Sequence, residues 1–539
     1  MSTTQRRPEQ PEPGPDARGG WRAGIDMPMV VIGAGLVVLF LVAGVVFTDP
    51  VRIGGAHIYA FIAQWFGWFY VVSTAGFVFF ILWMGFGRVG RVRLGDPDDR
   101  PEYSTFSWIA MMFALGVGIG LIFYGAAEPV LLYDQPPPGG PQAGTPEAAI
   151  VGMQYSLFHW CLHPWAFFGV AGLALAYSLH NKGRPSLVTS TLKPMLGRHS
   201  REDSTASRTI NTWVVVTTLV GNAVTLGLGT LQIIAGLGYI GGLSSSTWLL
   251  IAVVGLLTIG FLFSATAGVS KGIKRLADFN VLLAVALLLF LFVFGPIRFI
   301  FDLSAEAFGG YLFNFLPMAF ETGALDQGTW MQNWTVFFWA WGISWAPYVG
   351  SFLARISRGR TIREYVLGVL VAPSLATVVW FSVLGGAALD LQFNGVDVAS
   401  AASESPQAAL FEVLGQYPLT TVTSVAVIVL AAIFFVSGAD AGAIVLGTFS
   451  SWGNPEPKVW ITLMWGSLIG AVALVLLVVG GLDALQWGAI VAAAPFVLVL
   501  VAMCVGLVLD MRADGLFRRA RGAPEGAAAT PPGTGPRRD

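Results

Sequence analysis

Long apolar stretches alternate with shorter polar connections along most of the 539-residue chain. A helix needs roughly 20 apolar residues to cross the hydrocarbon core of a bilayer, and twelve stretches of that kind occur. They are centred near residues 37, 76, 116, 166, 223, 257, 287, 344, 375, 435, 469 and 497. The pattern predicts an all-α membrane protein with twelve transmembrane helices in one domain, residues 27–510.

The two tails of the chain have a different character. Residues 1–26 and 511–539 are polar and rich in proline, glycine or alanine, and neither contains a long apolar stretch. Segments of this composition bury too little apolar surface to offset the entropy of ordering. We expect both tails to be disordered.

The composition agrees with a membrane protein and excludes several other classes. Hydrophobic residues make up 55% of the chain and charged residues only 11%, whereas soluble domains carry roughly a quarter charged residues. Cys161 and Cys504 are the only cysteines, both within apolar stretches, so a disulfide framework is not expected. The net charge of −1 gives no indication of a nucleic-acid partner, and no cofactor is predicted.

The basic residues predict the orientation of the chain. Of the 30 Lys and Arg residues, only Arg52 and Arg298 fall in alternate connections, and the others share one side. The positive-inside rule therefore places both termini in the cytoplasm of a multi-pass cell-membrane protein. The outward connections 134–149, 299–333 and 389–420 contain almost no basic residues, and we expect these loops to cover an external vestibule.

Two of the predicted spans contain residues that disfavour a helix. Gly116, Gly118 and Gly120 alternate in the third span, and Gly342 and Pro347 fall in the eighth, so we expect both helices to be interrupted. The spans are five apart, which predicts two five-helix repeats, 101–297 and 334–510, after two additional helices in 27–100. The alternative is that the glycines only allow close helix packing. Paired interruptions favour a binding site between the two segments.

Aromatic side chains cluster in the same region. Trp341 and Trp345 are four residues apart and hence share a helical face, while Trp160, Trp165 and Phe168 fall within an arc of about 140°. Aromatic cages bind quaternary ammonium cations through cation–π attraction. The alternative is that these tryptophans belong to interfacial belts, but their positions are too deep within the spans for that.

Four motifs in order make the chain resemble the betaine/choline/carnitine transporter (BCCT) family. They are MMFALGVGIGLIFYGAAEP in the third span, HWCLHPWAFFG in the fourth, WTVFFWAWGISWAPYVGSFLARISRGRTIREY from Trp334 to Tyr365, and FFVSGADAG in the tenth. The resemblance covers residues 27–510 and implies twelve helices with two inverted five-helix repeats of the leucine-transporter type, and a homotrimer.

The resemblance also implies an aromatic box for a trimethylammonium head, built here from Trp160, Trp165, Phe168, Trp341 and Trp345. Members commonly have Tyr at the position of Phe168 and a second Trp at that of Gly342, so the cage here is more open. The backbone around Gly116, Gly118 and Gly120 is expected to meet a substrate carboxylate.

The resemblance also implies a sodium site. The matching positions are Ala114, Val117, Phe434 and Ser437, with Gly438 in place of the second hydroxyl that members usually provide. A hard cation needs several oxygen ligands, so Na⁺ is the first expectation and H⁺ the second.

Two carboxylates stand within or beside the apolar spans. Asp440 follows Ser437 by three residues and is predicted to orient the cation site or to carry a proton, and the alternative is that it bonds backbone at a helix break. Glu128 precedes Pro129, and we expect it near the outer surface.

His159 and His163 have the i, i+4 spacing of a metal site, but no third ligand is evident, and no transition metal is expected.

Together, these features predict a secondary transporter that imports a quaternary-ammonium or sulfonium compatible solute by ion-coupled alternating access. The alternative is a transporter-like sensor that binds the same ligand without moving it. No nucleophile or metal constellation indicates an enzyme.

Overall fold

The computed structural model describes residues 23–116, 118–266, 270–324 and 329–517, and within these ranges the regular structure is helical apart from one isolated bridge between Arg93 and Thr361. The α-helices, in chain order, are α1 (Met27–Val46), α2 (Thr48–Phe86), α3 (Thr105–Gly116), α4 (Ile119–Asp134), α5 (Pro146–Trp160), α6 (Leu162–Ala176), α7 (Val188–Thr191), α8 (Lys193–Leu196), α9 (Thr205–Gly241), α10 (Thr247–Thr266), α11 (Ser270–Phe294), α12 (Ile297–Ala319), α13 (Thr329–Met331), α14 (Phe337–Ile356), α15 (Ile362–Phe393), α16 (Val398–Glu404), α17 (Ala409–Gly415), α18 (Thr420–Ser450) and α19 (Val459–Ala513). Two π-helical turns, η2 (Tyr177–Asn181) and η4 (Gln332–Val336), continue α6 and precede α14. The predicted all-α membrane class is confirmed.

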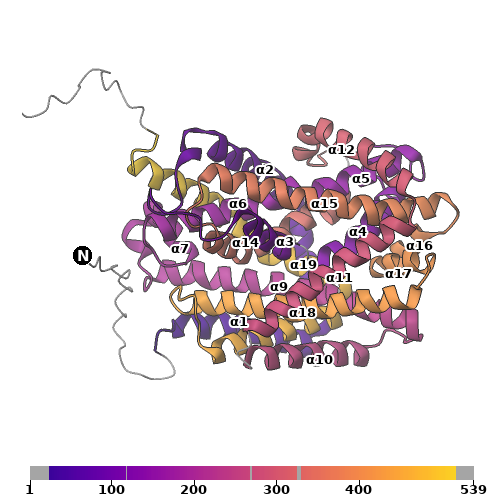
Figure 1. Cartoon of the computed structure of the whole chain (residues 1–539). Helices are drawn as coiled ribbons and strands as arrows, with labels where there is room; N and C mark the ends of the chain where they lie inside the picture. The colour runs from indigo at the N-terminus through magenta and orange to yellow at the C-terminus, as the bar shows by residue number, and fades with distance from the viewer. Residues whose placement is uncertain (1–22, 117, 267–269, 325–328, 518–539) are drawn as a thin grey trace, which may run out of the picture.

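The long helices lie side by side in one bundle (Figure 1). In the described part of the chain, eight helical stretches are long and apolar enough to cross a membrane when α5, α6 and η2 (Pro146–Asn181) count as one, or nine if Asp278–Phe294 and α12, which meet at 107°, also count as one. Each predicted span centre falls in a described helix, and α19 holds the last two. The count of twelve crossings remains a prediction.

Helices α5, α6 and α9 form the centre of the bundle. Their most apolar windows are 83% buried, against 28% for α1 and 17% for the window in α10. Helix α9 packs against α14, α18 and α19, and α14 also packs against α6. Apolar residues of α1 and α10 consequently face outward, where lipid would solvate them.

Helix α19 turns back on itself at Gly480 and Gly481, whose backbone angles are not helical. At 1.5 Å per residue, its 55 residues would make a rod of about 80 Å, much longer than a bilayer is thick. Near its start, the Trp465 indole donates to the Ser450 hydroxyl at 2.8 Å, and near its end Asp510 pairs with Arg184. Gly480 lies beside Arg52, toward the face of the bundle opposite to the one where both ends of α19 lie.

The predicted interruption of the third span is confirmed. Helix α3 ends at Gly116, and α4 begins at Ile119 after Gly118, whose φ of −113° and ψ of −178° are extended. Val117, between them, lies outside the described residues. Helix α3 packs mainly on α15 and also on α14, and α4 packs on α15 and α5 and also contacts α9 and α18.

The predicted interruption of the eighth span is wrong. Helix α14 runs without a break through both Gly342 and Pro347. The Ser351 hydroxyl donates to the Pro347 carbonyl at 2.7 Å, and the ring of Phe167 lies so close to Gly342 that a Cβ there would be 2.5 Å from it. The glycine therefore provides room for a neighbouring ring instead of ending the helix.

The fourth span, expected to be one helix, is divided at Cys161 into α5 and α6. Pro164 falls in the first turn of α6, where a missing backbone N–H costs nothing, because the first four N–H groups of a helix have no partner within it. The arc argument for the aromatic residues of this span therefore applies only within α6.

The connections expected to be outward loops contain helices. Helix α12 occupies much of 299–333 and packs on α5 and α15, while α16 and α17 fall within 389–420 (Figure 1). Residues of these segments contact one another and α5, as in the hydrogen bonds from Trp330 to the Gln135 carbonyl and from Tyr155 of α5 to Glu321.

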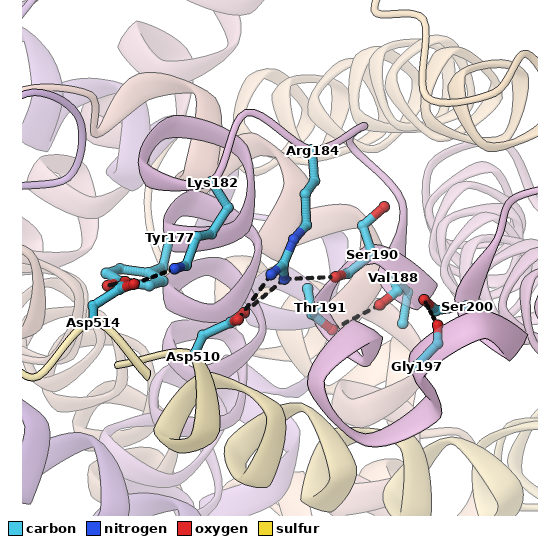
Figure 2. A network of polar contacts seen from close by, with 10 residues as sticks. All are labelled: Tyr177, Lys182, Arg184, Val188, Ser190, Thr191, Gly197, Ser200, Asp510 and Asp514. Carbon is cyan, nitrogen blue, oxygen red and sulfur yellow. Dashed lines mark hydrogen bonds and ion pairs between the residues drawn. The ribbon is translucent and has the colours of Figure 1, made fainter. Parts of the chain in front are cut away.

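Both described ends of the chain lie at one face, the terminal face. The Asp26 amide donates to the Ser450 carbonyl at 2.9 Å, and its carboxylate accepts from Arg208. Figure 2 shows the other end, where Arg184 donates to both oxygens of Asp510 at 2.6 and 2.8 Å, and Asp514 accepts from Tyr177 and Lys182. We call these five residues, Tyr177, Lys182, Arg184, Asp510 and Asp514, the C-terminal clasp. Asp26 and residues 511–517, assigned to the tails from the sequence, are thus part of the fold.

Candidate functional site

A cavity lined mainly by aromatic rings lies at the break between α3 and α4. It has about 660 Å³ of empty space, including the part that opens toward solvent. Its aromatic walls are Trp160, Trp165, Phe168, Phe338, Trp341 and Trp345, and the imidazole of His159 also lines it. The five aromatic residues expected from the sequence are thus brought together by α5, α6 and α14, and Phe338 is an addition that the sequence analysis missed.

The backbone of the α3–α4 break forms another wall through Gly118 and Gly120. A Cβ at Gly120 would lie 2.5 Å from the Trp160 ring and 2.6 Å from the Trp341 ring, whereas one at Gly118 would meet only Trp345, at 3.7 Å. Gly120 is therefore a place where two indoles contact the main chain. Gly116, the third glycine predicted for the site, is the last residue of α3, before the break.

The start of α4 supplies the polar part of this wall. The first amide groups of a helix have no partner within it and carry partial positive charge, which suits an anion such as a carboxylate. Gly118 is the N-terminal cap of α4 and has no side chain to accept from those amides.

The indoles meet edge to face. The ring centroids of Trp160 and Trp341 are 5.7 Å apart at 87°, those of Trp341 and Trp345 are 6.1 Å apart at 75°, and Trp165 meets Phe168 at 5.6 Å and 82°. Because neighbouring rings are nearly perpendicular, their π faces point in different directions around the same cavity. An aromatic enclosure of this kind attracts cations through the ring quadrupoles.

Helix α9 fixes two of the indoles by hydrogen bonds. Trp345 Nε1 donates to the Gly221 carbonyl at 3.0 Å, and Trp341 Nε1 is 3.3 Å from the Thr225 hydroxyl, which itself donates to Gly221. Because Gly221 and Thr225 of α9 accept hydrogen bonds from both indoles, the α14 side of the cage is anchored to the centre of the bundle.

Gly342 contributes only backbone to the cavity. Phe167, fully buried behind it, occupies the direction in which a side chain at 342 would extend. A second tryptophan at this position would need Phe167 to move, so the cage lacks a ring there.

Glu128, expected near the outer surface, is instead fully buried beside the cage. Its Oε2 accepts from Trp160 Nε1 at 2.7 Å, and its Oε1 is 2.7 Å from His159 Nδ1. His159 Nε2 is in turn 3.0 Å from the Thr335 hydroxyl. An acidic residue within an apolar span was the one feature of the sequence that indicated a role for Glu128. The sequence could not show that Glu128 contacts His159 and Trp160, which are 31 and 32 residues away along the chain.

The residues expected for the ion site lie on two elements. Ala114 is in α3, and Val117 lies outside the described residues. Phe434 and Ser437 lie on α18, where the Ser437 hydroxyl donates to the Ile433 carbonyl at 2.8 Å. Gly438 has open space on its side-chain side, since a Cβ there would have no neighbour within 4 Å.

Asp440 is buried and accepts from Ser264 of α10 at 3.0 Å. Its described partner is therefore a side chain of an outer helix.

The two histidines with metal-like spacing have separate environments. His159 belongs to the chain from Glu128 to Thr335, whereas the ring of His163 stacks on Trp339 at 4.9 Å and 24°. Among the described residues, no group of three or more His, Cys, Asp or Glu side chains could hold a metal ion.

Known proteins resemble this chain over most of its length. The family described as BCCT, betaine/carnitine/choline family transporter, matches residues 28–516. The glycine betaine transporter OpuD of Bacillus subtilis is 42% identical over 466 residues, which cover 86% of this chain and 90% of that protein. The betaine/ectoine transporter LcoP of Corynebacterium glutamicum is 36% identical over 504 residues, 92% of this chain and 80% of that protein. The high-affinity choline transport protein of Escherichia coli is 35% identical over 492 residues, 90% of this chain and 72% of that protein.

Proposed function

Since the chain belongs to the BCCT family of betaine/carnitine/choline transporters, and is thus a multi-pass membrane transporter and not an enzyme, we propose that it imports a compatible solute with a methylated onium head. The observation that carries this proposal is the cavity in which indole and phenyl rings surround one space beside the start of α4. A cationic head would lie against the rings, and a carboxylate would lie at the helix N-terminus.

The cavity supports a zwitterion of the glycine betaine type better than a simple cation. Aromatic rings and the N-terminus of α4 stand at the same cavity, so both ends of a short zwitterion would find a complementary partner. The relatives are named for transport of glycine betaine, of betaine and ectoine, and of choline. Because Gly342 adds no ring, the cage would also admit a bulkier head, such as a cyclic amidinium or a sulfonium.

We propose that transport is coupled to Na⁺, with H⁺ as the alternative, and proceeds by alternating access between two five-helix repeats, 101–297 and 334–510. Support for sodium comes from the backbone released at the α3–α4 break and from Ser437 and the open space beside Gly438 on α18. Support for a proton comes from Asp440, a buried carboxylate within α18.

We further propose that both termini are cytoplasmic and that the protein is a homotrimer. The distribution of Lys and Arg supports the orientation, and both described ends of the chain lie at one face. Cross-linking in native membranes would measure the number of subunits, and a purely monomeric pattern would contradict the trimer.

Uptake into proteoliposomes tests the function. Radiolabelled glycine betaine, choline and ectoine are supplied outside the vesicles under an inward Na⁺ gradient, an inward H⁺ gradient or no gradient. We expect concentrative uptake of at least one solute under one gradient only. Saturable binding to the purified protein with no flux under any gradient would contradict the transporter and favour the sensor.

A further inference from the structure

Glu128 is a carboxylate buried in the apolar interior whose recorded partners are an indole and an imidazole. Its side chain has no exposed surface, and among the described residues no Lys or Arg forms an ion pair with it. Burying a carboxylate without a full countercharge costs several kcal/mol unless hydrogen bonds compensate for it. Glu128 lies on α4 about two helical turns after Leu121, which lines the cavity. A buried carboxylate so near a cavity is a candidate for a functional role.

The geometry connects this carboxylate to the wall of the cavity. Trp160 lines the cavity, and its Nε1 donates to Glu128 Oε2 at 2.7 Å, at the short end of the range for N–H···O hydrogen bonds. The same indole meets the Trp341 ring at 87°. An indole can rotate about two side-chain torsions, so the bond to Glu128 selects the one orientation in which the ring meets both the cavity and Trp341.

The contact continues from Glu128 to a second wall. His159 bridges Glu128 Oε1 and the Thr335 hydroxyl, and its ring stacks on Phe338 with centroids 4.7 Å apart and planes at 20°. Phe338 lines the cavity. One carboxylate on α4 therefore connects a ring of α5 with a ring at the start of α14.

We propose that Glu128 is the positioning residue of the cage: its carboxylate holds Trp160 directly, and Phe338 through His159, in the orientation that binds the onium head. An indole whose N–H donates to a carboxylate also becomes richer in π electrons, which strengthens its attraction for a cation. The proposal rests on the proposed function and assigns a role to a residue that does not itself line the cavity.

The test compares two substitutions at Glu128 with a matched control. Glu128→Met keeps a similar volume without an acceptor, so it leaves the Trp160 N–H without its hydrogen-bond partner. Glu128→Gln keeps an acceptor for the Trp160 N–H. Glu321→Gln is the control, because Glu321 accepts from Tyr155, another aromatic residue of α5 that does not line the cavity.

We expect Glu128→Met to raise the KM for glycine betaine uptake about tenfold, with the maximal rate nearly unchanged, and Glu128→Gln to stay within about threefold of the unmodified protein. Glu321→Gln should leave KM unchanged. An unchanged KM in Glu128→Met would overturn the proposal, and so would an equal loss in Glu128→Gln and Glu128→Met.

A spectroscopic measurement separates positioning from substrate chemistry. In protein labelled with 5-fluorotryptophan, the ¹⁹F signal of Trp160, assigned from Trp160→Phe, should shift in Glu128→Met and not in Glu321→Gln. If the unmodified protein transports none of the solutes, the proposed function falls, while this signal still decides whether Glu128 orients Trp160. If Glu128→Met does not fold, Thr335→Val, which removes the far end of the contact, should raise KM roughly threefold, and an unchanged KM there counts against the proposal.

Discussion

The rings of Trp160 and Trp341 can lie against the main chain at Gly120 because that residue has no side chain. We predict that Gly120→Ala raises the KM for the transported solute at least about tenfold, since a Cβ at 2.5 and 2.6 Å from two indoles would push both rings apart. Uptake kinetics in proteoliposomes measure the effect. Gly67→Ala is the matched control, because Gly67 of α2 does not line the cavity and its Cβ would make only an ordinary contact at 3.6 Å with Val336. Equal KM values for the two variants would contradict the prediction.

Trp345 is the second residue at which a substitution is informative. Replacing it with alanine removes a cation–π partner within a desolvated cage, worth about 2 kcal/mol, so affinity should fall roughly thirtyfold. Trp345→Phe keeps a ring but loses the hydrogen bond to Gly221, and we expect a smaller loss. Isothermal titration of the purified protein with glycine betaine would check the order, and uniform affinity across the three proteins would argue against the cage.

The sequence predicted the cage residues better than their support. Tryptophans within apolar spans are visible in a sequence, and all of those chosen line the same cavity. Glu128 was placed near the surface because Pro129 follows it, yet α4 continues through this proline and its carboxylate points to α5. Which side chains meet across two helices depends on helix rotation, and a single sequence does not contain that information.

At the level of helices, the C-terminal clasp joins the end of α19 to the segment that follows α6 (Figure 2). Arg184 and Asp510 are largely buried, so Asp510→Ala would leave a cation without its partner. We expect a loss of about 3 kcal/mol in the free energy of unfolding, seen as a lower melting temperature in detergent. Asp203→Ala removes a fully solvated pair with Arg201 and should change the melting temperature little. Similar shifts for both variants would mean that the clasp adds no stability.

The clasp should also respond to acid. Burial raises the pKa of Asp514, but hydrogen bonds from Lys182 and Tyr177 outweigh this and leave it below its ordinary value of 3.8. A lowered pKa in the folded state stabilises the fold fully above pH 3.8, and this contribution is lost as the pH falls through the lowered value. The melting-temperature difference between the unmodified protein and Asp514→Asn should therefore be constant from neutral pH to about 5 and shrink below 3.8. A difference that vanishes already near neutral pH would contradict this.

Helix interruptions were predicted unevenly, and the reason is physical. Three alternating glycines leave little to hold the α3–α4 region in a helix, and the break occurs there. One glycine and one proline did not break α14, because packing against α6 and α9 on both sides outweighs the propensity of two residues. Pro164 marked a break at Cys161 that the tryptophan pattern had hidden.

For the whole molecule, the predicted orientation can be measured by labelling. Arg201 and Asn394 are exposed at opposite faces of the bundle, and the native Cys161 and Cys504 lie within it. In intact cells, a membrane-impermeant maleimide should label Asn394→Cys and not Arg201→Cys, because the basic connections are expected inside. Permeabilised cells provide the control, in which both should react. Labelling of Arg201→Cys alone in intact cells would reverse the orientation.

The fold class and the positions of the long helices followed from the long apolar stretches, because each crossing must satisfy its own backbone in lipid. The helices in the connections between the crossings could not be predicted in this way. Segments such as α12 and α16 are short or partly polar, and they are stabilised by contacts with α4, α5 and α15 that become visible only in three dimensions.

The two-glycine turn within α19 affects how the protein is made. Gly481, at a φ of +59°, adopts a backbone conformation that residues with side chains rarely accept, and it leaves no polar linker between the two arms. Because so short a turn joins the two arms, we expect both arms to enter the bilayer together. During synthesis, we expect the last 55 residues of helix to leave the translocation machinery as one paired unit.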